Sequence, residues 1–287
     1  MTKATEHPET ESPQSSSAYK VPAGEKTIDL IEYMARAEHP QTKSEIAAGM
    51  GKSMQEVYRI IQLLVDRGYL EKHANGDRFG LSMRLFSLAH RMPAVKTLSE
   101  ASAGPMRNLV NNVKQSCHLG ILRGTQLIVV SQFASPLNMS YSVTLGAHFP
   151  AHETGSGLVL LAGSEVTKRE AFFAQLGDIL GDAKEVVHVR QLVDEITQTG
   201  FHVRPSLVVD GVVNISHPVQ NMRGETIAAL TVPYISIKGS TLSLEYTTNA
   251  AVAGACAISE ALGCPDHLLQ NKIDYSTVSP EAVSSRI

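Results

Sequence analysis

Two short segments of the 287-residue chain carry side chains whose types and spacing suit molecular recognition. Gln55 and Arg59 lie four residues apart, so on a helix they share one face. In the major groove of DNA, glutamine suits adenine and arginine suits guanine. Thr154 and Ser156 flank Gly155 just before an apolar run that is typical of a helix. Hydroxyls and backbone N–H groups at a helix N-terminus can bind a carboxylate or a carbonyl, so this second segment predicts a small-molecule site.

The segment around Gln55 has the element order of a winged helix-turn-helix. Apolar residues at helical spacing predict three helices, over 25–38, 43–48 and 53–67. Two strand-like runs follow, over 69–73 and 78–81, and Asn75-Gly76 between them is typical of a hairpin turn. From Lys26 to Lys96 there are 11 basic and 8 acidic side chains, a net charge of +3, although the whole chain carries -3. Phosphate contacts are therefore favoured in this segment.

Side chains on and around the third predicted helix are the candidate contacts with DNA. Gln55 is expected to pair with a base, while Arg59 suits guanine or phosphate and Tyr58 suits phosphate. Glu56 would repel phosphate, yet its carboxylate could accept a hydrogen bond from cytosine. The candidates are Lys43, Lys52, Ser53, Met54, Gln55, Glu56, Tyr58, Arg59, Lys72 and Arg78. The alternative, that the Gln–Arg pair is only a solvated helix face, stays open.

The rest of the chain predicts an α+β domain. Strands are expected at 116–122, 126–133, 138–144, 201–204, 212–217 and 225–232. Helices are expected at 82–92, ended by Pro93, and at 97–113, 157–162, 165–176, 192–199 and 241–262. Strands joined as hairpins between helices favour a six-stranded, largely antiparallel sheet. The expected domains are a disordered arm (1–23), a winged helix-turn-helix (24–82), a linker helix (83–95), a second domain (96–264) and a tail (265–287).

Composition and motifs speak against several classes of protein. No run of about 18 apolar residues is present and the first 24 residues are polar, so we expect no membrane span, no signal peptide and a cytoplasmic protein. Three cysteines suit a reducing compartment rather than a disulfide framework. His148 and His152 lie four apart, but Pro150 breaks the helix face that joint metal binding requires. No metal is expected, and without a dinucleotide or phosphate-loop motif no cofactor is expected.

Six strings, taken in order, resemble the isocitrate lyase regulator (IclR) family of bacterial transcription factors. They are Thr27-Ile28-Asp29-Leu30-Ile31, Val57-Tyr58-Arg59-Ile60-Ile61-Gln62-Leu63-Leu64, Arg67-Gly68-Tyr69-Leu70-Glu71, Phe79-Gly80-Leu81, Gly146 with His152 and Gly155, and Ile227-Ala228-Ala229-Leu230-Thr231-Val232. The resemblance implies a winged helix-turn-helix, a linker helix and a GAF-like domain that senses a small, usually acidic metabolite, in a dimer or a dimer of dimers. Where relatives usually have Lys-Ser-Thr entering the recognition helix, this chain has Met54-Gln55-Glu56, so the family's operator does not carry over.

The resemblance also implies which residues contact the effector. Its effector loop matches Thr154, Gly155 and Ser156, and the matching pocket positions are Phe149, Val212, Asn214 and Thr231. Gly155 would let a ligand approach the backbone, and Asn214 needs a partner because its amide interrupts an apolar strand. Arg204 is a further candidate, as a forked partner for a carboxylate. A helix cap with a tight turn is the alternative for the loop.

These observations predict a ligand-responsive regulator of a catabolic operon rather than an enzyme. Its partners would be a double-stranded DNA operator and a small organic or aromatic acid, or a related carbonyl compound. Repression and activation stay open, as does a pocket that has lost its ligand. The alternative from another class is a hydrolase that uses the Ser156 hydroxyl with the nearby His152 imidazole.

Overall fold

The computed structural model describes residues 21–73, 76–236 and 242–269. Residues 1–20 and 270–287, which hold most of the expected arm and tail, lie outside the described residues, as does Asn75 of the expected hairpin turn. The chain divides into two compact units, with the boundary between His90 and Arg91. Within the described ranges, no helix is both long and apolar enough to span a membrane.

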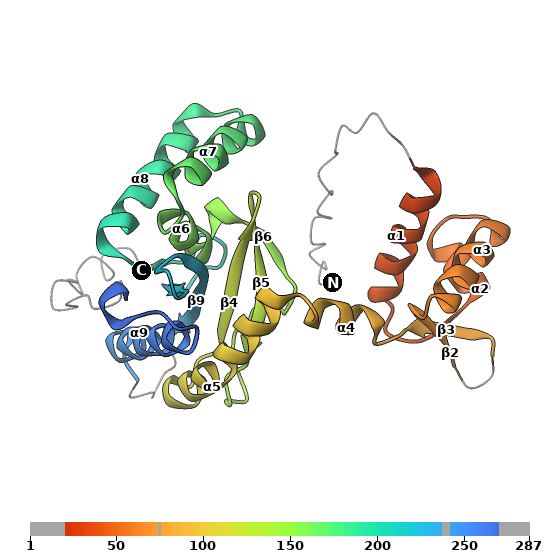
Figure 1. Ribbon diagram of the computed structural model, residues 1–287, viewed down its shortest axis with the longest axis horizontal. Helices are drawn as coiled ribbons and strands as arrows, with labels where there is room; N and C mark the ends of the chain where they lie inside the picture. Colours follow the sequence, from red (N-terminus) through yellow and green to blue (C-terminus); the bar gives the residue numbers. More distant parts are fainter. Residues whose placement is uncertain (1–20, 74–75, 237–241, 270–287) are drawn as a thin grey trace, which may run out of the picture. The chain divides into compact units, whose positions relative to one another are not determined.

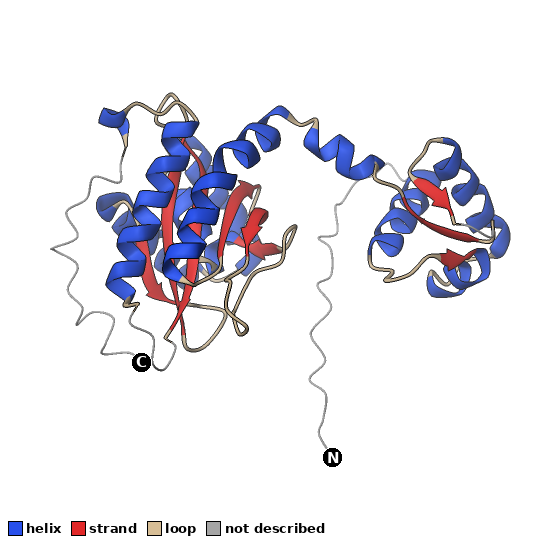
Figure 2. Ribbon diagram, turned by 90° about the horizontal axis from the view of Figure 1, so that it is seen from below, coloured by secondary structure: helices blue, strands red, loops and turns tan. Residues whose placement is uncertain are grey.

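The N-terminal unit is a winged helix-turn-helix. Its elements are α1 (Pro22–Ala35), β1 (Gln41–Thr42), α2 (Lys43–Gly49), α3 (Met54–Asp66), β2 (Leu70–Lys72), β3 (Arg78–Leu81) and α4 (Arg84–His90). The three strands form an antiparallel sheet in the order β1-β3-β2, with helices packed around it (Figure 2). Sequence patterning missed β1, because two residues are too short to show an alternation.

Two capping boxes begin the central helices of this unit. The side chain of Thr42 accepts a hydrogen bond from the backbone N–H of Glu45 at the start of α2, and Ser53 accepts from Glu56 at the start of α3. The apolar stripes of the helices then meet in one core, in which Leu30, Ile46, Ile61, Leu64 and Phe79 are buried. Burial of this stripe leaves the opposite face of α3 in solvent.

The C-terminal unit is a six-stranded sheet with helices on both faces. Its elements are α5 (Pro93–Val113), β4 (Cys117–Arg123), β5 (Gln126–Phe133), β6 (His148–Pro150), the 3-10 turn η1 (Ala151–Glu153), α6 (Gly155–Ala162), α7 (Val166–Leu180), α8 (Ala183–Thr199), β7 (His202–Pro205), β8 (Val212–Gln220), β9 (Thr226–Ile235), α9 (Leu244–Ala261) and the 3-10 turn η2 (Asp266–Leu268). The strand order is β6-β5-β4-β9-β8-β7, and every neighbouring pair is antiparallel. The α+β fold with a six-stranded antiparallel sheet, expected from the sequence, is confirmed.

The helices divide between the two faces of this sheet. Helices α5 and α9 lie side by side on one face, and α6 lies on the other with α8 and α7 outside it (Figure 1). Leu119 and Leu230 are buried in the core between the sheet and the α5/α9 layer. Leu158 and Leu161 of α6 are buried in the second core. Because α6 is apolar on every side, it is enclosed between the sheet and α8.

Two sequence-based assignments were wrong for physical reasons. Residues 138–144 form no strand, and β6 takes the sixth place in the sheet. Tyr141 and Val143 are half-buried while their neighbours are exposed, so the alternating exposure that is typical of a strand is present. The segment nevertheless pairs with no other strand of the sheet. Helix α8 begins at Ala183, nine residues before the expected start, because Asp182 caps it by accepting from the N–H of Lys184. Pro93 does separate two helices, since it opens α5 from the first turn, where a missing N–H costs nothing.

Candidate functional site

The exposed face of α3 presents polar side chains in its first turns. Val57 and Ile61 hold the helix on the core, while Gln55 and Arg59 point away from it into solvent. Among the described residues, neither Gln55 nor Arg59 has a side-chain partner, so their donors are available to a ligand. Lys52, in the turn before α3, is exposed as well. This is the arrangement that groove entry requires.

Glu56 is occupied by the protein itself. One carboxylate oxygen accepts from the backbone N–H and the hydroxyl of Ser53, at 3.4 and 3.0 Å, and the other accepts from Lys26 Nζ of α1 at 2.5 Å. The hydrogen bond from Lys26, followed by that from Ser53, lowers the pKa of the Glu56 carboxyl. The sequence suggested that the Glu56 carboxylate would face DNA without a partner. In the structure Glu56 instead caps α3, and Lys26 of α1 balances its charge.

The basic candidates around α3 differ in whether their charged groups already contact other parts of the protein. Lys43 Nζ lies 4.6 Å from the centre of the Tyr58 ring, so it binds an aromatic face. Arg78 donates to the carbonyl of Pro40 at 2.8 Å and to Glu45 at 3.1 Å, which ties β3 to α2. Lys72, on β2, is exposed and has no partner within the described ranges. Lys52 and Lys72 are therefore the better placed of these cations for phosphate.

A buried chain of hydroxyls lies in the C-terminal unit, between α6 and the middle of the sheet. Ser156 Oγ lies 2.7 Å from Thr231 Oγ1, and Thr231 donates to Ser216 Oγ at 2.8 Å. His118 Nε2 lies 3.4 Å from Ser156 Oγ at the other end. Thr154 caps α6 by accepting from the N–H of Gly157 at 3.1 Å, and this holds Ser156 in the first turn.

The hydroxyl chain forms one wall of a small pocket. Five expected effector residues line it, Phe149, Thr154, Ser156, Asn214 and Thr231, together with His118, Leu127, Tyr141, Val143, Ser206, Val208 and Pro233. The cavity measures about 40 Å³. That volume is little more than one water molecule occupies. The loops that carry Tyr141 and Val208 form part of the lining, so the positions of these loops help to set the size of the pocket.

Three expected effector residues are not among those that line the pocket. Gly155 packs against protein, because a Cβ on it would lie 2.6 Å from Cδ2 of His202 and 3.0 Å from Oγ of Ser216. Its small size therefore serves the packing of β7 and β8 rather than a ligand's approach. Val212 is buried at the start of β8 and is not part of the lining. Arg204 is exposed and pairs with Glu195 of α8 at 2.5 Å.

His118 is the functional candidate that sequence reasoning missed. It is a polar residue within the apolar start of β4, the same signal that singled out Asn214. Burial lowers the pKa of His118 to about 4, so its imidazole is neutral at pH 7. Among the residues that the structure describes, no lysine or arginine lines the pocket. An acid in this pocket would therefore meet hydroxyl, amide and imidazole groups rather than a fixed positive charge.

His152 does not pair with Ser156 as the hydrolase alternative expected. Its Nε2 lies 3.5 Å from Glu153 Oε1, while the imidazole beside Ser156 belongs to His118. Nδ1 of His118 has no hydrogen-bond partner in the described part of the chain. A nucleophilic serine needs a base that a third group orients, and that group is missing here among residues 21–73, 76–236 and 242–269. The same residues contain no cluster of three or more potential metal ligands.

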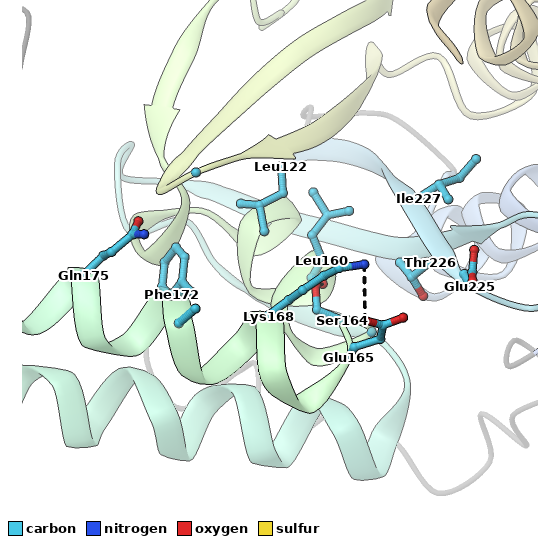
Figure 3. Close-up of a pocket in the computed structure, with 13 residues that line it drawn as sticks. Leu122, Leu160, Ser164, Glu165, Lys168, Phe172, Gln175, Glu225, Thr226 and Ile227 are labelled. Atoms are coloured by element: carbon cyan, nitrogen blue, oxygen red, sulfur yellow. Dashed lines mark hydrogen bonds and ion pairs between the residues drawn. The ribbon is translucent and has the colours of Figure 1, made fainter. Parts of the chain in front are cut away.

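A larger cavity of about 450 Å³ lies at the far end of α6, where α7 faces the turn between β4 and β5 and the start of β9 (Figure 3). Leu122 and Phe172 line it with apolar surface, and Lys168 pairs with Glu165, three residues earlier at the start of α7, at 3.3 Å. None of the expected effector residues belongs to it. Its charged groups are already paired within the protein, so the hydroxyl-lined pocket is the stronger candidate.

Comparison with protein families decides between a regulator and other users of this fold. The model described as "Bacterial transcriptional regulator IclR C-terminal" matches residues 92–260, and the IclR helix-turn-helix domain matches residues 25–74. The chain belongs to the IclR family. The protein is a transcriptional regulator with a helix-turn-helix DNA-binding domain and a C-terminal effector-binding domain.

Several IclR-family proteins are similar over most of their length. The transcriptional regulator KdgR of Dickeya chrysanthemi is 23% identical over 78% of this chain and 74% of its own. XynR of Escherichia coli K12 is 21% identical over 84% of this chain and 97% of its own. Among solved structures, an IclR homolog from Microbacterium hydrocarbonoxydans complexed with 4-hydroxybenzoate has a TM-score of 0.68 at 22% identity, covering 84% of this chain and 98% of that one. HmgR of Pseudomonas aeruginosa has a TM-score of 0.64 at 22% identity, with coverages of 85% and 100%.

Proposed function

We propose that this protein controls a catabolic operon in the cytoplasm. It binds a pseudo-palindromic operator as a homodimer or a dimer of dimers. When an effector occupies the hydroxyl-lined pocket, the protein releases the operator or binds it in a different arrangement. The observation that carries the proposal is that one chain contains both sites. Helix α3 exposes Gln55 and Arg59, which have no side-chain partner among the described residues, and the C-terminal unit contains a pocket built on Ser156 and Thr231. Linkage between the two sites requires only that the effector prefer one arrangement, typically by about 1–3 kcal/mol.

On the DNA side, α3 enters the major groove with Gln55 and Arg59 toward base edges. Lys52 and the exposed end of β2 at Lys72 contact phosphates on either side. Ser53 and Glu56 serve the groove contact indirectly, because they fix where α3 begins. Lys43 and Arg78 hold Tyr58 and the wing in place.

On the effector side, a small organic or aromatic acid, or a carbonyl relative of one, suits the pocket. Hydroxyls of Thr154 and Ser156 and the amide of Asn214 donate to carboxyl or carbonyl oxygens, while Phe149 and Tyr141 cover an apolar body. A structural relative was solved with 4-hydroxybenzoate, a ligand of this chemical class. The ligand would enter as the loops that carry Tyr141 and Val208 separate.

Assembly into dimers is supported by apolar surface on the N-terminal unit. Ile28 of α1 is 58% exposed, Met83, just before α4, is 67% exposed, and Phe86 of α4 is 56% exposed. Exposed apolar side chains that gather into one patch are typical of a protein interface. A second copy that covers them would set the spacing between two recognition helices, and hence the spacing of operator half-sites.

The experiment that tests this function uses the full-length protein. Duplexes are selected from a random pool and from the region upstream of the gene, and their retention is measured at low salt with and without a panel of small acids that includes 4-hydroxybenzoate. Arg59→Ala is expected to abolish selection, whereas Arg67→Ala removes the same charge from the far end of α3 and is the matched control. Failure to retain any duplex would overturn the regulator proposal, and retention insensitive to every acid would overturn the effector class.

A hydrolase remains the alternative from another class. The Ser156–His118 contact is the observation in its favour. We infer that the regulator has no hydrolase activity beside its DNA-binding role, because the matched relatives are regulators. Turnover of an ester or amide that Ser156→Ala abolishes would reverse that inference.

A further inference from the structure

Helix α3 exposes two apolar side chains beside its polar face. Met54, the first residue of the helix, is 49% exposed, and Tyr58, one turn later, is 48% exposed. At about 100° per residue, Met54 and Tyr58 share one line along the helix, next to the line of Gln55 and Arg59. Exposed apolar groups of this size at the groove-facing end of α3 have no role in the core of the unit, whose buried α3 residues are Val57, Ile61 and Leu64.

The Tyr58 ring is held in place by a neighbouring element. Lys43, the first residue of α2, places its Nζ 4.6 Å from the Tyr58 ring centre and 5.8 Å from that of Phe79. A cation between two aromatic faces fixes the rings and reduces the conformational entropy that binding would cost. On the opposite flank of α3, Glu56 is tied to Lys26. The apolar flank is therefore the one that faces α2, and the charged flank faces α1.

Apolar side chains in the major groove recognise one feature above all, the 5-methyl group of thymine. The same A·T pair that offers adenine N6 and N7 to a glutamine also presents this methyl group on its other base. Gln55 follows Met54 directly in the chain, so the two can address one base pair or two adjacent pairs.

We propose that Met54 and Tyr58 form a contact for thymine methyl groups, so that each operator half-site contains at least one thymine whose methyl packs on these two side chains. This inference rests on the proposed entry of α3 into the major groove. It adds a base preference that Gln55 and Arg59 alone do not supply.

The test replaces thymine by uracil, which removes only the methyl group. A duplex is first selected from a random pool with the full-length protein, and its dissociation constant is then measured with each thymine changed to uracil in turn. Burial of one methyl group predicts a loss of about fourfold at one thymine per half-site. Met54→Ala and Tyr58→Ala are expected to bind the thymine and uracil duplexes equally, while Met54→Leu retains the preference.

Leu63→Ala is the matched control, because Leu63 is 46% exposed on the same helix but on its other flank, and this variant is expected to keep the preference for thymine. Circular dichroism and thermal unfolding verify that each variant is folded. The proposal is overturned if the selected half-site contains no thymine, if no uracil substitution weakens binding twofold, or if Met54→Ala and Tyr58→Ala keep the full preference. If no duplex is selected at all, groove entry itself fails, and this inference falls with it.

Discussion

Gly155 lies so close to His202 that a Cβ on the glycine would be 2.6 Å from Cδ2 of the imidazole. Gly155→Ala is therefore expected to destabilise the C-terminal unit by about 1–3 kcal/mol, because the ring is buried and has little room to move. Gly177→Ala in α7 is the control, since nothing lies within 4 Å of its added Cβ and alanine favours a helix. Urea unfolding measures both, and equal effects at the two sites would contradict the packing argument.

The second prediction concerns how α3 begins. Ser53→Ala removes the hydroxyl that accepts from the N–H of Glu56, so the free energy of unfolding of the N-terminal unit should fall by about 1 kcal/mol. Glu56→Gln keeps the cap's shape but loses the charge that binds Lys26. If Glu56 acts only as a cap, Glu56→Gln should lower the melting temperature and select the same DNA sequence as the wild type. A changed base at one position would instead assign Glu56 a direct contact with DNA.

The third prediction is loss of stability in mild acid. Burial lowers the pKa of His118 and His202 to about 4 and that of His217 to about 3, against about 6.5 in an unfolded chain. Between these values the unfolded state binds more protons, so stability present above pH 6.5 is lost as the pH falls toward 4. Each imidazole contributes a slope of up to about 1.4 kcal/mol per pH unit. Urea unfolding of the C-terminal unit at pH 7.5 and pH 5 measures the loss.

Two variants separate these buried imidazoles from the exposed ones. His202→Gln is expected to reduce the pH slope, and His188→Gln, on the exposed face of α8, is expected to leave it unchanged. A wild-type stability that is flat between pH 7.5 and pH 5 would show that the buried imidazoles take up protons as readily in the folded state as in the unfolded state.

The fourth prediction separates pocket residues from their neighbours. Asn214→Ala is expected to weaken binding of a small acid about tenfold, because its amide lines the pocket. Arg204→Ala is expected to change binding less than twofold, since Arg204 pairs with Glu195 on the surface. Thermal shift against the acid panel, with 4-hydroxybenzoate as the first probe, measures both. A large effect of Arg204→Ala would return this arginine to the role of a carboxylate partner.

The sequence was most informative where one local rule governs the structure. The 3.6-residue spacing that buries Val57 and Ile61 predicted α3 and its exposed face. Short apolar, strand-like runs bounded by turn residues predicted β8 and β9. These elements depend on neighbours only a few residues away.

The remaining features depend on contacts between distant segments. Nothing near Glu56 in the sequence reveals Lys26, thirty residues earlier, as its partner. Gly155 appeared free for a ligand because His202 approaches it only after β7 joins the sheet. Tyr141 alternates like a strand residue, yet its segment covers the pocket without pairing. Each of these needs the tertiary structure.

The small volume of the pocket has a kinetic consequence for the effector that we propose binds there. A space of about 40 Å³ admits an aromatic acid only in a conformation in which the loops carrying Tyr141 and Val208 stand further apart. The apparent affinity is then reduced by the fraction of molecules in that open state. Association in turn is limited by the rate of opening, however abundant the acid becomes. Loop residues that never touch the ligand would thus set the delay between the appearance of a metabolite and the change in transcription.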